Sequence, residues 1–100
     1  MGTVRIEVLP WLTDYFHPRR PGRMVWDEEF GDGGALRDLL RQMEPSHPSF
    51  LAAIYDSDAG MLRSHIEVIV NDRLTSMLTI LDLCLKDGDH VIFLPSYSGG

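Results

Sequence analysis

The side chains that most often carry chemistry are sparse in this sequence of 100 residues. The chain has one cysteine, Cys84, which by itself forms neither an internal disulfide nor a zinc or iron–sulfur site. Its four histidines lack the spacing of metal ligands, so surface or capping roles are expected for them. The sequence offers no nucleophile–base pair and no glycine-rich phosphate loop. We therefore expect a protein that is not an enzyme in its own right and that binds no metal.

The remaining candidate for chemistry is the pair Gly99-Gly100 at the end of the sequence. A carboxylate becomes an acylating group once one of its oxygens is converted into a good leaving group. Glycine has no Cβ, so a Gly-Gly tail can enter a narrow site on a partner in backbone conformations that other residues avoid. Residues 96–100 contain nothing with which to build secondary structure. We expect them to be a flexible tail on one domain of residues 1–95.

The strands that would position this tail are predicted by alternation of apolar and polar residues. The first strand is apolar on one face only, through Val4, Ile6 and Val8. The second strand is expected to return antiparallel to the first. Asn71-Asp72 is a turn signal between the third strand and the fourth. The predicted strands are residues 3–8, 23–30, 66–70, 73–74 and 90–94.

The last predicted strand is apolar on both faces, which is typical of a central strand whose second face meets a partner. Val91 and Phe93 lie on one face, and Ile92 and Leu94 lie on the other. We predict that a partner docks on Ile92, Leu94, Pro95 and Tyr97.

One amphipathic helix is predicted after Gly34, with Asp32 as its N-cap and Pro45 ending it. A sheet is the surface available to bury its apolar stripe. This layout predicts an α+β protein of the β-grasp (ubiquitin-like) class, with a mixed sheet of four to five strands and one main helix packed across it. The apolar stripe consists of Leu36, Leu39, Leu40 and Met43.

Two segments allow more than one interpretation. Residues 48–56 fit a short helix, since Pro48 suits a first turn and Phe50 and Ile54 would share a face. The apolar stretch Met77 to Leu85 favours burial in the core over a partner surface, and within it Cys84 is expected to be a small buried hydrophobic residue.

Composition narrows the class of protein and its location. The formal net charge of −6 argues against non-specific nucleic-acid binding, which needs Lys and Arg, and is compatible with a basic protein partner. We find neither a long apolar span nor the pattern of a signal peptide. A chain with one cysteine suits a reducing compartment. We therefore expect a cytoplasmic protein that binds neither membranes nor nucleic acid.

The C-terminal half resembles the MoaD/ThiS family of ubiquitin-fold sulfur carriers. Its upstream part resembles a longer branch of that family, similar to the molybdopterin synthase small subunit, the sulfur carrier of cysteine synthesis and archaeal ubiquitin-like small modifiers. The resemblance is carried by residues 55–56, 60–63, His65, 66–72, 85–91, 93–95 and Gly99-Gly100.

This resemblance implies a specific chemistry for Gly100. An ATP-dependent enzyme of the ubiquitin-activating type would adenylate its carboxylate, and a sulfur donor would convert the acyl-adenylate into a thiocarboxylate. The carrier itself would bind no cofactor, because ATP is used by the partner. The sulfur would pass to an acceptor enzyme such as the large subunit of molybdopterin synthase.

Three alternatives stay open at this stage. The acceptor pathway could be cysteine synthesis, thiamine synthesis or tRNA thiolation rather than molybdopterin synthesis. The chain could also be a ubiquitin-like modifier that forms isopeptide bonds through Gly100. The third alternative is a β-grasp interaction domain whose tail serves neither sulfur transfer nor isopeptide formation.

Overall fold

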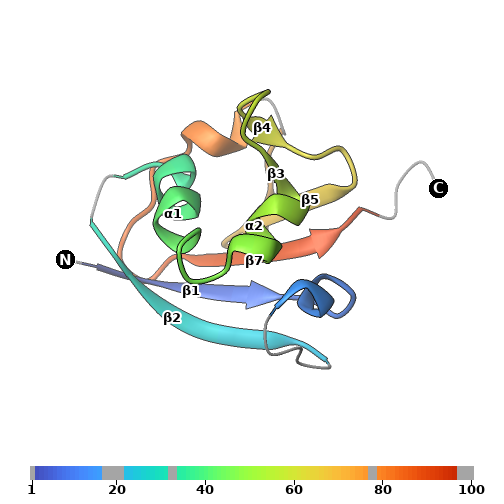
Figure 1. Ribbon diagram of the computed structural model, residues 1–100. Coiled ribbons are helices and arrows are strands. Elements are labelled where there is room, and N and C mark those ends of the chain that lie inside the picture. Colours follow the sequence, from blue (N-terminus) through green and yellow to red (C-terminus); the bar gives the residue numbers. More distant parts are fainter. Residues whose placement is uncertain (1, 17–21, 32–33, 77–78, 97–100) are drawn as a thin grey trace.

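The fold is a five-stranded mixed sheet with two helices on one face, as seen in a computed structural model that describes residues 2–16, 22–31, 34–76 and 79–96 (Figure 1). This confirms the predicted β-grasp class. The first helix is the predicted one, and the second occupies the segment that the sequence left open. Across the sheet the order is β2 (Met24–Phe30), β1 (Gly2–Val8), β7 (His90–Pro95), β5 (Ile66–Val70) and β6 (Arg73–Leu74).

Strand β7 holds the sheet together because it pairs with strands from both halves of the chain. It runs parallel to β1, with Ile6 opposite Val91, and antiparallel to β5, with Val68 opposite Phe93. The hairpin of β1 and β2 pairs Gly2 with Phe30 and extends the sheet on one side. All five predicted strands are therefore present, and the last is central as predicted.

Helix α1 (Leu36–Met43) buries the whole predicted stripe, and hydrogen bonds to Asp38 and Leu83 hold its start. The N-cap is Ala35, whose N–H donates to the Asp38 carboxylate at 3.0 Å. The N–H of Leu36 donates to the carbonyl of Leu83 at 2.9 Å. The prediction of Asp32 as N-cap is wrong, because the helix begins at Leu36, and Asp32 itself lies outside the described residues.

Helix α2 (Pro48–Ile54) is the second helix, and its first residue is the predicted proline. Proline fits there because the first N–H of a helix has no intrahelical acceptor. Phe50 and Ile54 share its buried face, as the sequence indicated. The helix leads directly into a two-stranded hairpin of β3 (Tyr55–Asp56) and β4 (Met61–Leu62).

Two turns require left-handed backbone. Asn71 and Asp72 have φ angles of 52° and 65°, which suits the tight turn joining β5 to β6. Gly88 has a φ of 90° in the turn before β7, and its neighbour Asp87 accepts a hydrogen bond from the Thr3 N–H at 2.8 Å. The turn before β7 is therefore tied to the beginning of β1.

The short 3-10 helices are η1 (Leu12–Tyr15) after β1 and η2 (Ile80–Asp82) before β7. In the apolar stretch from 77 to 85, the described residues Ile80, Leu81 and Leu85 are buried, which confirms a core role for them. Cys84, in contrast, is exposed, so the prediction that it is buried is wrong. It sits in an extended bridge to Ala35, where Leu85 next to it turns inward and Cys84 turns outward.

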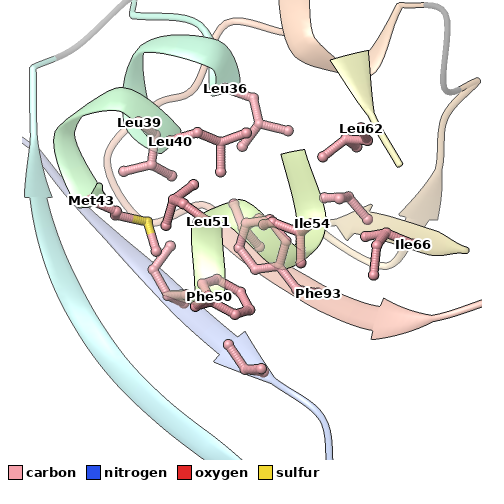
Figure 2. Close-up of a cluster of buried hydrophobic side chains, with 14 of the residues drawn as sticks. Leu36, Leu39, Leu40, Met43, Phe50, Leu51, Ile54, Leu62, Ile66 and Phe93 are labelled. Carbon is pink, nitrogen blue, oxygen red and sulfur yellow. The ribbon is translucent and has the colours of Figure 1, made fainter. Parts of the chain in front are cut away.

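The core lies between the helices and the inner face of the sheet. Figure 2 shows side chains from α1, α2 and β7 converging in this cluster. The Phe50 and Phe93 rings meet edge to face with their centroids 5.6 Å apart, a favoured aromatic geometry.

Replacing Leu40 with alanine should lower the free energy of unfolding by about 2–5 kcal/mol, because the side chain is 1% exposed and its loss leaves a cavity. Urea denaturation would measure the change. A loss below about 0.5 kcal/mol would show that the stripe does not pack as described.

Candidate functional site

The end of β7 determines where the predicted tail begins. Val91, Phe93 and Pro95 point into the core and are buried, whereas Ile92 and Leu94 are half-buried on the opposite face. This alternation is the one predicted for a central strand that offers its second face to a partner. The docking role of Ile92 and Leu94 stays a prediction that this position permits.

Pro95 is the last residue of β7 and is paired with Ile66. One residue further on, the Ser96 N–H donates to the carbonyl of His65 at 2.7 Å. The chain is therefore held by backbone hydrogen bonds as far as Ser96. Tyr97, Gly99 and Gly100 lie outside the described residues, and what the sequence predicts for them stays a prediction.

The outer face of the sheet carries neither α1 nor α2 (Figure 1). The strand registers place a row of side chains across this face. Sequence reasoning found only Ile92 in this row. Ile69 was the available signal for the rest, since it is an apolar residue on the same strand face as the charged Glu67. The strand registers place in one row, called the outer row below, Val25, Glu7, Ile92, Ile69 and Leu74.

The ends of the outer row are open to solvent, with 48% of Val25 and 67% of Leu74 exposed. Isolated exposed apolar residues are ordinary, but a row of them on one sheet face is typical of a contact surface. The outer row can therefore supply an apolar contact that crosses β7, the strand that leads to the tail.

Glu7 is the charged member of the outer row, and it is well buried. Its Oε1 lies 2.9 Å from His90 Nε2, and its Oε2 accepts a hydrogen bond from the Arg23 guanidinium at 3.2 Å. These contacts join β1, β7 and the residue before β2. A partnered carboxylate in an apolar row adds directional recognition to an otherwise non-directional surface.

Trp11 lies in the turn between β1 and η1, beside the last residue of β7. Half of the residue is exposed, at 52%, and its ring meets the His65 ring edge to face at 6.2 Å. The two line a hollow of about 430 Å³ together with Pro95 and Ser96. Pro95, predicted to dock a partner, thus reaches the surface at this hollow although most of it is buried.

The backbone of Trp11 is strained, with φ of 86° and ψ of −49°. Such angles cost a residue with a side chain roughly 1–3 kcal/mol. Leu12, which follows, is fully buried, and the Leu9 N–H before the turn donates to the Phe93 carbonyl at 3.1 Å. These anchors hold the turn, so Trp11 points outward. Sequence reasoning missed Trp11. The only indication of this residue in the sequence is that a large aromatic residue directly follows a proline in a turn.

In the described part of the chain, the polar side chains do not form a metal site. In that part no group of three or more His, Cys, Asp or Glu side chains is placed to hold a metal ion. The described histidines contact aromatic rings or a carboxylate instead, as with His47 against Phe16 and Trp26. Among the described residues no helix is long and apolar enough to cross a membrane.

The sequence pattern of the ThiS family matches residues 22–100. The chain belongs to the ThiS family. The match covers the helices, β5, β7 and the Gly-Gly end, and it leaves out β1 and η1. No protein of curated function matches the chain.

Solved structures confirm the ubiquitin-like fold of this ThiS-family chain. SAMP1 from Haloferax volcanii superposes with a TM-score of 0.74 at 21% identity, over 99% of this chain and 100% of that one. A putative molybdopterin converting factor subunit 1 from Pyrococcus furiosus has a TM-score of 0.66 at 23% identity, over 96% and 99%. A chain of the BexX/CysO complex from Amycolatopsis orientalis has a TM-score of 0.65 at 23% identity, over 95% and 99%. The family and these neighbours are small ubiquitin-fold carriers and modifiers.

The two faces of β7 should respond differently to substitution. Ile92→Gln should change the free energy of unfolding by about 1 kcal/mol or less, because its side chain borders solvent. Phe93→Ala should cost about 3–5 kcal/mol, because Phe93 is fully buried. Equal losses for the two variants in urea denaturation would show that Ile92 belongs to a packed interior.

Proposed function

We propose that this protein is a cytoplasmic sulfur carrier, in which the carboxylate of Gly100 is adenylated and then converted into a thiocarboxylate. The observation that carries the proposal is the extent of the family match, which runs through Gly100, beyond the last strand at Pro95. The functional group then lies past the folded domain, as it must if an enzyme is to surround it.

The proposed chemistry has two steps. A carboxylate oxygen of Gly100 attacks the α-phosphorus of ATP on a partner enzyme, and pyrophosphate leaves. A sulfur nucleophile then attacks the carbonyl carbon, and AMP leaves with the electrons of the carbon–oxygen bond. This chain supplies the acyl group and the contact surface, whereas the partner holds ATP and provides the catalytic groups.

The surface available for the adenylating enzyme includes the outer face of β7. Ile92 and Leu94 lie there, Pro95 lies at the root of the tail, and we propose that all three contact this enzyme together with Tyr97. Burying such apolar area favours association by roughly 25 cal/mol per Å². The net charge of −6 favours a basic partner surface around it.

For the acceptor, we propose the large subunit of a molybdopterin synthase, so that this chain is the small-subunit type. The Pyrococcus furiosus neighbour bears a name of that kind. The CysO-containing neighbour is as similar at 23% identity, so a carrier for cysteine synthesis is the main alternative, followed by thiamine synthesis and tRNA thiolation.

A ubiquitin-like protein modifier is the second candidate function. It is favoured by the likeness to SAMP1, which has the highest TM-score of the three neighbours described above. In that case a lysine amine of a target protein, rather than sulfur, attacks the activated Gly100 carbonyl, and an isopeptide bond forms. High-mass conjugates that resist thiol reductants would support the modifier.

Deleting Gly100, or adding an alanine after it, should abolish ATP–pyrophosphate exchange by the cognate adenylating enzyme. The reacting carboxylate would then be displaced by one residue, or about 3.5 Å, from the site of adenylation. The thermal unfolding midpoint should stay that of the wild type, because both changes lie beyond β7. An unchanged rate of ATP–pyrophosphate exchange with either variant would contradict the proposed function.

A further inference from the structure

We propose that the hollow beside the root of the tail, between Trp11 and His65, binds an arginine side chain of the adenylating enzyme that holds Gly100. This inference rests on the proposed function and extends it to a second contact, separate from the outer row of the sheet. The hollow is lined by Trp11, His65, Pro95 and Ser96.

Trp11 has the properties of a contact residue rather than of a core residue. More than half of it is exposed although it is among the most hydrophobic residues of the chain, and its backbone angles are unfavourable for any residue with a side chain. Tryptophan is also enriched among the residues that dominate binding energy at interfaces. A glycine in this turn would relieve the strain, so the fold alone gives no reason for a tryptophan there.

The length of the tail places the enzyme over this hollow. Residues 96–100 span at most about 18 Å even when fully extended, since each residue advances no more than about 3.6 Å. Ser96, which lines the hollow, is hydrogen-bonded to His65 and fixes the starting point of that span. An enzyme that encloses the Gly100 carboxylate must therefore lie within about 18 Å of the hollow, close enough for its surface to cover Trp11.

Charge selects the kind of side chain that fits. None of the residues lining the hollow is Lys or Arg, and one of them, Ser96, donates a hydrogen bond from its hydroxyl to the Glu67 carboxylate at 3.4 Å. The whole chain carries a net charge of −6. The face of a tryptophan ring attracts guanidinium groups more strongly than other aromatic faces do. An arginine that stacks on Trp11 fits both the absence of a basic lining residue and the acidic charge of the chain.

The test measures ATP–pyrophosphate exchange by the cognate adenylating enzyme as a function of carrier concentration. Trp11→Gly should raise the KM for the carrier about five- to tenfold, because a cation–π contact is lost, and leave kcat at saturation unchanged. Trp11→Leu should raise KM as much, since leucine keeps the apolar area without the ring, and Trp11→Phe should lie between these variants and the wild type. Tyr15→Leu is the matched control, because Tyr15 is an exposed aromatic residue of η1 that does not line the hollow, and its KM should match the wild type's.

The possible outcomes separate this inference from the proposed function. A wild-type KM for Trp11→Gly would overturn the inference and leave the carrier function standing. If Trp11→Leu alone keeps the wild-type KM, the group that occupies the hollow is apolar, and the proposal of a cationic partner is overturned. The unfolding midpoint of Trp11→Gly should be no lower than that of the wild type, because glycine relieves the backbone strain at this position, and a fall in that midpoint would assign Trp11 a structural role instead. No exchange with the wild-type chain would contradict the proposed function itself.

Discussion

The pairing of β7 with both β1 and β5 is the constraint on which the rest of the structure depends. The two neighbours come from opposite ends of the chain, so the sheet closes only when the last strand inserts between them. Phe93 then fills the core against Phe50, and every second residue of β7 is turned to the outer face. The same strand therefore completes the fold and ends at Pro95, where the predicted tail begins.

Much of this arrangement follows from the sequence because strong periodic signals agree with one another. The stripe that ends at Met43 and the alternation from Ile66 to Val70 each allow one buried face. Cys84 and Asp32 were predicted wrongly because both depend on long-range backbone contacts. The Leu36 N–H bonds to Leu83, and that tertiary bond decides where the helix starts and which side of the segment faces out.

The candidate site was predictable only where it coincides with strand alternation. Ile92 and Leu94 follow from the pattern of β7, whereas Leu74 joins the same surface only through the register of a two-residue strand. Trp11 becomes adjacent to Pro95 because η1 packs at the end of β7, a contact between residues far apart in the sequence. Local sequence patterns do not indicate which distant residues lie side by side in the fold. Composition likewise does not indicate where the backbone is strained.

The measurement that tests the central claim most directly is the intact mass of the protein purified from its own host without reductant or acid. Replacement of one oxygen by sulfur at the Gly100 carboxylate adds about 16 Da, and the sulfur-carrier function predicts this species. Because thiocarboxylates hydrolyse, the same mass is measured after incubation with the matched adenylating enzyme, ATP and a sulfur donor. A mass that stays unmodified after that incubation would contradict the carrier function.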